Sequence, residues 1–411
     1  MSSFIYPTDP QICNGLKECF DLIQHMAEVE SPLYPVPPNE RQLVELLESC
    51  YAASLETEEG RTIAFTVDFF GEDEPHFDYQ LKQTLLLSPR DLTRLAVALD
   101  PWRSRICVIP VGTALQIVSV IHLGEQFAFH GTRLTLRQFS IRVLAPGVLV
   151  VRYSGVLLLT YQRGRFAFHC GSSARWDQFA VRTALAFHSH VGQTVEQLQV
   201  DLRFEAALIR IVRTMLYLRH GGTLLILPDD THWENSAFSK RYAPTAPVTV
   251  VKDANVKDME YAIKRNELFQ QVIQGQSNPE VASVWADDIV RARFVSELEW
   301  LARLTLTDGM TVIQRDLTLL GFGVFFDAQD KPDSPTRIVL IDPYDDGSDS
   351  EPKALASIGG ARHQSAAVTC RRFPGAIAVV ASQDGSLSSM KWDATNNVVI
   401  AFHHLELLLE F

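Results

Sequence analysis

A compact group of polar donors occupies the stretch from Gly359 to Ser365. Two adjacent glycines let the backbone approach another group closely or adopt a positive φ angle. Arg362 and His363 follow at once, and their donors suit an anionic group, with phosphate the obvious ligand. The stretch predicts an anion site. An ordinary glycine turn with a surface arginine and a structural histidine is the alternative, because short motifs match by chance.

Two further stretches carry carboxylates. Asp308-Gly309-Met310 is expected at a corner between a helix and a strand, and Ser382-Gln383-Asp384-Gly385 closes a later strand. Phosphoryl or nucleotidyl transfer requires a carboxylate that positions a metal or accepts a proton. It also requires cationic or neutral donors, such as arginine and histidine, that bind the phosphate. Each loop alone is a weak signal. Their order along an α/β background predicts that they meet around one triphosphate.

The segments that must position these loops alternate between helix and strand from about residue 202. An apolar stripe at helical spacing ends at Gly221-Gly222, and a strand of buried type follows at residues 223–227. Residues 257–306 are largely helical and run into a strand at 311–313. This repeated order of helix, glycine and strand predicts two βα units of one sheet. Further strands are expected at 319–326, 337–341, 376–382 and 387–392, followed by a last apolar segment.

The first part of the chain, residues 1–200, has a different pattern of predicted helices and strands. Residues 10–30 and 40–56 are predicted helices, with Asn39 as the N-cap of the second. A short helix begins with Ser88 as its N-cap and Pro89 at its first position. Short segments rich in β-branched and aromatic residues indicate strands at 63–69, 106–109, 115–122, 134–143, 148–153, 156–161 and 165–169. We therefore expect an α/β protein with a β-rich α+β module over residues 1–200 and a mixed-sheet domain with flanking helices over residues 201–411.

Composition excludes several classes of function. The formal net charge is −12 and no run of lysine and arginine occurs, which disfavours direct binding to nucleic acid. The six cysteines are widely scattered without a CxxC pair, which argues against a zinc site and a disulfide framework. No signal peptide and no apolar run long enough to cross a bilayer is evident. These features predict a cytoplasmic protein without a membrane partner.

Residues from about 200 to 400 resemble the diadenylate cyclase domain of the DisA N-terminal type. The family has a strand of Gly-Ala-Leu-Ile character, an Asp-Gly-Ala motif, a Gly-Thr-Arg-His-Arg-Ala-Ala motif and a Val-Ser-Glu-Glu-x-Gly motif. The matching stretches here are Gly221–Ile226, Asp308–Met310, Gly360–Ala366 and, loosely, Ala381–Gly385. More loosely, the chain resembles bacterial proteins in which such a domain follows a probable sensor module of the DACNV type and is thought to sense nucleotides in stress or conflict systems.

The resemblance implies that two ATP molecules are joined into cyclic di-AMP with Mg²⁺ or Mn²⁺ across the face of a homo-oligomer. Asp308 would hold the metal or act as base toward the 3′-hydroxyl, and Arg362 and His363 would contact the phosphates. Gly309 would let adenosine lie close to the backbone, and Met310 would border the nucleotide. The remaining binding residues implied by the motifs are Gly360, Gln364, Ser365, Ser382 and Asp384.

Three positions depart from the family motifs. Met310 stands where the family has alanine, Ala361 replaces a threonine and Gln364 replaces an arginine. Each lost phosphate contact would cost roughly 1.5–3 kcal/mol where it is charge-assisted. The sequence therefore leaves open an active cyclase, a catalytically degenerate sensor that binds a nucleotide or cyclic dinucleotide, and a structural α/β protein.

Overall fold

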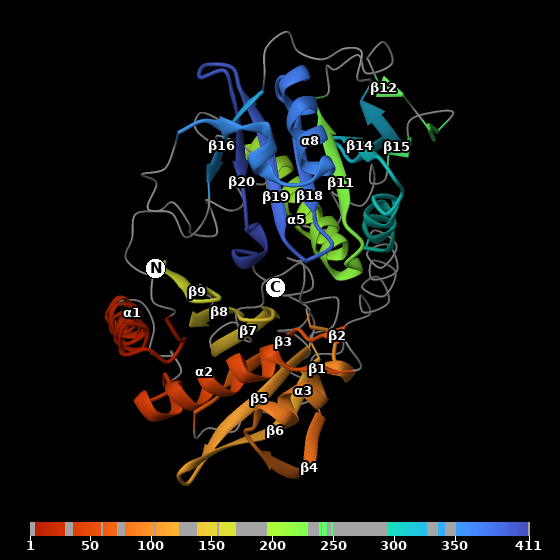
Figure 1. The fold of residues 1–411 in the computed structure, drawn as a ribbon. Coiled ribbons are helices and arrows are strands. Elements are labelled where there is room, and N and C mark those ends of the chain that lie inside the picture. The colour runs from red at the N-terminus through yellow and green to blue at the C-terminus, as the bar shows by residue number, and fades with distance from the viewer. Residues whose placement is uncertain are drawn as a thin grey trace. The chain divides into compact units, whose positions relative to one another are not determined.

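The chain forms two compact units in the computed structural model (Figure 1). One comprises Met1–Val181 together with Leu407–Phe411, and the other comprises Arg182–Glu406. The sequence placed the division between residues 200 and 201. The structure describes residues 5–28, 36–58, 61–71, 79–101, 104–122, 138–153, 156–169, 195–228, 238–239, 241–244, 248–249, 295–326, 336–341 and 351–409. Within these ranges no helix is both long and apolar enough to cross a membrane.

The first unit is built on an eight-stranded sheet of order β10-β9-β8-β7-β3-β5-β6-β4. Only β3 and β5 pair in parallel among its described neighbours; the other pairs are antiparallel. A short β1–β2 pair stands apart from this sheet. The strands are β1 (Thr57–Glu58), β2 (Arg61–Thr62), β3 (Phe65–Phe69), β4 (Tyr79–Leu86), β5 (Ser104–Val111), β6 (Ala114–His122), β7 (Phe139–Ala145), β8 (Val148–Tyr153), β9 (Val156–Gln162) and β10 (Arg165–Phe168).

Three described helices of this unit begin where the sequence indicates. They are α1 (Pro10–Glu28), α2 (Glu40–Leu55) and α3 (Pro89–Ala98). Asn39 caps α2 with a full capping box, because its side chain accepts from the Gln42 amide while the Gln42 side chain accepts from the Asn39 amide. The Ser88 hydroxyl oxygen accepts from the Asp91 amide at the start of α3. Both predicted N-caps are confirmed.

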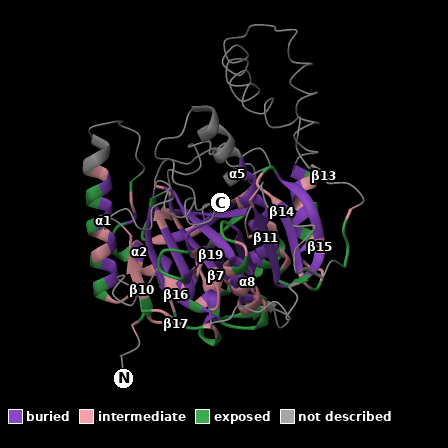
Figure 2. Cartoon of the chain, turned by 90° about the horizontal axis from the view of Figure 1, so that it is seen from above, coloured by how far each residue is buried: buried purple, intermediate pink, exposed green. Residues whose placement is uncertain are grey.

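The core of the first unit lies between these helices and one face of the sheet. Phe65, Val67 and Phe69 of β3 point into it, as the two-residue period of a strand requires. On α1 the apolar side chains recur at helical spacing, so Figure 2 shows that helix buried along one side and exposed along the other. The opposite face of β3 carries Asp68, whose pKa is raised by burial although Arg105 lies 3.7 Å away.

The second unit contains a ten-stranded sheet with the path β12-β15-β14-β11-β18-β19-β20-β16-β17, and β13 pairs with β15. β11 and β14 are parallel neighbours, which confirms the prediction that the two βα repeats belong to one sheet. The strands are β11 (Gly222–Leu227), β12 (Phe238–Ser239), β13 (Val248–Thr249), β14 (Met310–Gln314), β15 (Thr318–Phe326), β16 (Arg337–Ile341), β17 (Lys353–Ala354), β18 (Ile377–Ala381), β19 (Leu387–Asp393) and β20 (Val398–Phe402).

Helices cover both faces of this sheet, with α5 (Val195–Leu218) on one and α8 (Ala361–Arg372) on the other (Figure 1). A further helix spans residues 295–304 and buries Leu298 and Leu301. Short 3-10 helices lie at η4 (Leu355–Ile358) and η5 (Leu405–Leu407). β11 is buried along its whole length because both of its faces are covered. The fold is thus mixed α/β with two multi-stranded sheets, as the sequence predicted.

Candidate functional site

One end of the second sheet gathers the three segments that the sequence singled out. Thr223 pairs with Met310, and Gly222 pairs with Ala381. Because β11 and β14 run in parallel and β18 runs against them, the starts of β11 and β14 lie beside the end of β18. If this register continues, Asp308 lies beside Gly221 on one side of β11. The turn at residues 382–386 lies on the other side of β11, after the end of β18. The carboxylate corner and the β18–β19 turn share one end of the sheet.

Arg362 reaches this end from the first turn of α8. A Cβ added at Gly221 would lie 2.7 Å from Arg362 Nη1, 3.3 Å from Gln383 Cγ and 3.4 Å from the carbonyl oxygen of Ala381. The missing side chain at Gly221, whose φ is +78°, leaves the space that the guanidinium occupies. Within the described ranges, no hydrogen bond or ion pair engages the side chains of Arg362 and Asp308. The half-buried guanidinium of Arg362 thus lies at the start of β11.

Two glycines at this end serve close backbone packing. A Cβ at Gly222 would lie 2.6 Å from Thr305 Oγ1, so the glycine lets the end of helix 295–304 approach β11. Gly309 has a φ of +106°, and a Cβ there would meet the Gly323 carbonyl carbon at 2.8 Å and the Val324 oxygen at 2.9 Å. The sequence interpreted Gly309 as making room for adenosine. In the structure, the position of its missing side chain is filled by the backbone of β15.

The Gly359–Ser365 stretch runs from two glycines into the first turn of α8, a helix that the sequence did not predict. Gly360 is the N-cap of α8 and makes no side-chain capping hydrogen bond. A Cβ added at Gly360 meets nothing within 4 Å, so the helix start faces open space. The amides of an uncapped first turn, together with the helix dipole, favour an anion. Arg362 projects from that turn.

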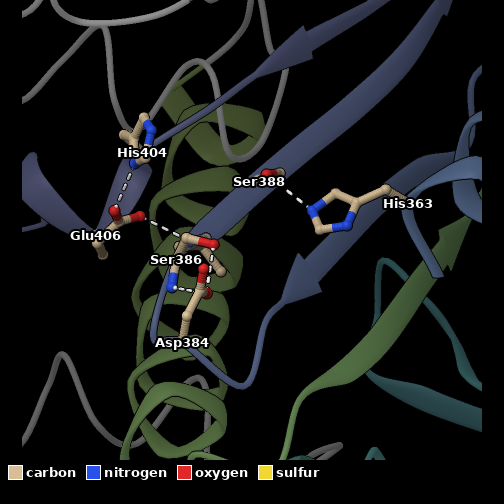
Figure 3. Close-up of polar contacts among 7 residues, drawn as sticks. His363, Asp384, Ser386, Ser388, His404 and Glu406 are labelled. Atoms are coloured by element: carbon tan, nitrogen blue, oxygen red, sulfur yellow. Dashed lines mark hydrogen bonds and ion pairs between the residues drawn. The ribbon is translucent and has the colours of Figure 1, made fainter. Parts of the chain in front are cut away.

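His363 points from α8 toward the sheet rather than into this open space. Its Nε2 lies 3.2 Å from Ser388 Oγ on β19 (Figure 3). Its ring stacks on that of His403 at a centroid distance of 5.8 Å. Burial lowers the pKa of His363, although Asp384 partly raises it. The imidazole is therefore neutral at pH 7 and bonded within the unit.

The other residues implied on α8 and β14 also contact protein. Gln364 Nε2 donates to the Gly359 carbonyl at 2.8 Å, which fastens the side chain to the turn before the helix. The Ser365 side chain is half-buried, and its carbonyl accepts from Thr369 Oγ1 at 2.8 Å. Met310 is 3% exposed and packs in the core between the sheet and α8. None of these three contacts by itself marks a ligand position.

The β18–β19 turn presents a fixed carboxylate at the same end. Ser382 begins the turn, with its amide donating to the Ser386 carbonyl at 2.8 Å. Asp384 Oδ1 accepts from the Ser386 amide at 3.0 Å and from the Ser386 hydroxyl at 2.8 Å (Figure 3). Burial alone would raise the pKa of Asp384, but these two hydrogen bonds, together with the Asp384 amide and the nearby His404, lower the net pKa. Asp384 is therefore ionised at pH 7.

A second carboxylate braces the same turn from the end of the sheet. Glu406 Oε2 accepts from the Leu387 amide at 2.7 Å, and Glu406 Oε1 lies 3.0 Å from His404 Nδ1 (Figure 3). Glu406 is almost fully buried. A buried carboxylate that holds the first amide of β19 fixes where the turn points. Sequence reasoning missed this contact, because Glu406 lies after the last strand.

The donor set of the described residues fits a metal only when a ligand brings further oxygens. No group of three or more histidines, cysteines or acidic residues there could hold a metal ion. Mg²⁺ bound with a nucleotide needs just one or two protein carboxylates, since phosphates and water complete its shell. Asp308 is exposed at the corner and meets that requirement. Asp308 is thus the residue that would hold such an ion.

Asp308, Arg362 and the Ser382–Ser386 turn thus lie at one end of the sheet. The side chains of His363, Gln364 and Met310 instead contact other parts of the protein. Sequence reasoning missed the role of Gly221 as the space beside the guanidinium. The signal was present, because two glycines directly before a buried strand often mark a close approach.

Comparison with known proteins adds one finding. Residues 32–122 match the family of the probable sensor domain DACNV, and the match covers α2 to β6 of the first unit. No curated protein matches the chain. A sensor-type domain therefore lies in the N-terminal part of the chain.

Proposed function

We propose that the second unit binds a nucleoside triphosphate at the end of its sheet and condenses two ATP molecules into cyclic di-AMP, with one pyrophosphate leaving from each ATP as its α-phosphate bonds to a 3′-hydroxyl. The observation that carries the proposal is the position of Arg362. Its guanidinium lies over Gly221 at the uncapped start of α8, at the same end of the sheet as the Asp308 corner. A cation, helix amides and a nearby carboxylate for a divalent ion are the groups that phosphoryl chemistry uses.

In this proposal each chain residue has a limited task. Arg362 and the first amides of α8 hold the phosphates, and Asp308 places the divalent ion or accepts the proton of the attacking hydroxyl. Mg²⁺ or Mn²⁺, when bound, would neutralise phosphate charge. Asp384 keeps the neighbouring turn in shape through its hydrogen bonds to Ser386. The reaction joins two nucleotides, so two copies of the site must face each other.

The test is calorimetry with ATP and Mn²⁺, followed by chromatography for cyclic dinucleotide. Replacing Arg362 by alanine should weaken ATP binding about 10–100-fold, because a charge-assisted phosphate contact is lost. Asp308→Asn should abolish turnover and spare most of the binding. Arg337→Ala and Asp316→Asn are matched controls, since both residues are exposed at the opposite end of the sheet. Turnover per chain should also rise with protein concentration.

A second candidate function is nucleotide sensing without turnover. His363 and Gln364 both make protein contacts in place of phosphate contacts, and a sensor-type domain precedes the unit. The same calorimetry, extended to cyclic di-AMP, separates the two. Tight binding with no product beside an active control cyclase supports the sensor. If the protein binds neither ATP nor cyclic di-AMP, both proposed functions are ruled out.

A further inference from the structure

Tyr242 carries an aromatic ring that packs against Phe322 on one face and is partly exposed to solvent, near the loop that contains Asp308. The rings of Tyr242 and Phe322 are stacked, with centroids 5.0 Å apart and planes 19° from parallel. Their backbones exchange two hydrogen bonds of 3.2 and 2.9 Å, so the pair is fixed in register. Tyr242 nevertheless stays 49% exposed. One face of its ring is held against Phe322, and much of the remaining ring is available to a ligand.

Gly323 connects this ring to the proposed site. A Cβ added at Gly323 would lie 3.1 Å from Tyr242 Cδ2 and 3.3 Å from Thr307 Cγ2. Gly309 packs against the backbone of the same glycine. Tyr242 therefore lies against the loop that presents Asp308, although it precedes that loop by many residues in the chain.

The separation suits a nucleotide. Arg362 lies over the start of β11, β14 carries the Asp308 corner, and Tyr242 pairs with β15. Neighbouring strands are about 4.8 Å apart, so the three spacings from β11 through β14 and β15 to the strand position of Tyr242 put the guanidinium and the aromatic ring about 14 Å apart across the sheet end. A nucleoside phosphate carries its base and its phosphates at opposite ends of the ribose and is of a size to bridge this gap.

We propose that Tyr242 is the platform on which the nucleobase stacks, and that it makes the site prefer purine over pyrimidine nucleotides. This inference rests on the proposed nucleotide site and adds its base subsite. Every base has a π-face, so stacking on an aromatic ring is favourable without hydrogen-bond readout. The larger purine ring system covers more of the tyrosine. The phosphates extend toward Arg362, and the ribose passes the Asp308 corner.

The direct readout is the fluorescence of 2-aminopurine riboside triphosphate, which is quenched when the base stacks. The wild-type protein should quench it, and Tyr242→Ala should abolish quenching and weaken ATP binding about tenfold or more. Tyr242→Phe and Tyr242→Trp should keep both properties. Tyr217→Ala removes a similarly exposed tyrosine from α5 and should change neither. Should Tyr242→Ala fail to fold, Tyr242→Leu compared with Tyr242→Phe gives the same test.

Inorganic tripolyphosphate separates this inference from the function on which it rests. Tyr242→Ala should bind tripolyphosphate like the wild type, because that ligand has no base, whereas Arg362→Ala should weaken both ligands. Wild-type protein that binds neither ATP nor tripolyphosphate overturns the nucleotide site and the base subsite together. Wild-type protein that binds ATP without quenching, or a Tyr242→Ala variant with unchanged ATP affinity and unchanged purine preference, overturns the base subsite alone.

Discussion

At the residue scale, Gly221 is the position that most directly controls Arg362. Its φ of +78° is strained for any other residue, and a methyl group there would meet the guanidinium at 2.7 Å. Gly221→Ala should therefore lower the free energy of unfolding of the second unit by about 1–3 kcal/mol. It should also displace Arg362 and weaken ATP binding. Urea denaturation and calorimetry measure the two effects.

Gly360→Ser is the matched control for this change. Gly360 has a φ of −70°, with nothing within 4 Å of an added Cβ. Serine at an N-cap accepts from the first turn of a helix, so this variant should be as stable as the wild type or slightly more stable. Equal losses at positions 221 and 360 would contradict the assignment of strain to Gly221.

His363 should make the stability of the second unit sensitive to acid. Burial lowers its folded-state pKa below the ordinary value of 6.5, so the unfolded chain takes up the proton first. The stabilisation from the neutral imidazole is complete above pH 6.5 and is lost as pH falls toward the folded pKa. His363→Gln should reduce the difference in unfolding free energy between about pH 7.5 and about pH 5.5. His220→Gln, at an exposed histidine, should leave that difference unchanged.

At the element scale, the α2 capping box is a local device with a measurable contribution. Asn39→Ala leaves the Gln42 amide without its side-chain acceptor and should cost about 1 kcal/mol of unfolding free energy in the first unit. Asn39→Asp keeps an acceptor at the cap and should retain most of the stability. Thermal or urea unfolding of the two variants compares them. An Asp variant as unstable as the Ala variant would show that the cap is not the cause.

Strong local patterns predicted most of the elements. β8 and β16 have the predicted bounds because runs of β-branched residues end at turn residues. α8 was missed because its buried face, His363, Ala366, Ala367 and Cys370, is at helical spacing but is made of small or polar side chains, and Gly360 offers no side-chain cap. β4 (Tyr79–Leu86) was missed because it is an edge strand with a largely polar surface.

The candidate site was only partly predictable, because the sequence shows residue types but not how the strands and helices pack. Residue types marked Asp308 and Arg362, but their place at the same end of the sheet depends on β18 running antiparallel to β11. Local composition does not determine the direction in which strands pair. The inward turn of His363 follows from its place on the buried face of α8. Tyr242 could not be found from sequence, since its relation to Asp308 arises only through the packing of Gly323 against Gly309.

At the scale of the whole molecule, the end of the chain belongs to the unit in which the chain begins. Leu407, Leu408 and Leu409 are almost completely buried and are grouped with Met1–Val181. Arg152 Nη2 on β8 donates to the carbonyl oxygens of Leu408 at 3.0 Å and Leu409 at 3.3 Å. The second unit is thus enclosed in sequence by segments of the first, and the two ends of the chain belong to one compact unit.

A chain that ends at Glu406 tests this arrangement. Each buried leucine contributes about 1.5–3 kcal/mol, so deletion of the last residues should cost the first unit several kcal/mol, because apolar burial and the Arg152 contacts are lost together. Hydrogen exchange locates the effect: amides of β8 and β9 should exchange faster, while those of β11 and β18 keep their protection. Arg152→Met, which removes only the two hydrogen bonds, should produce a smaller change in the same strands. Loosening confined to β18 would instead place the end of the chain in the second unit.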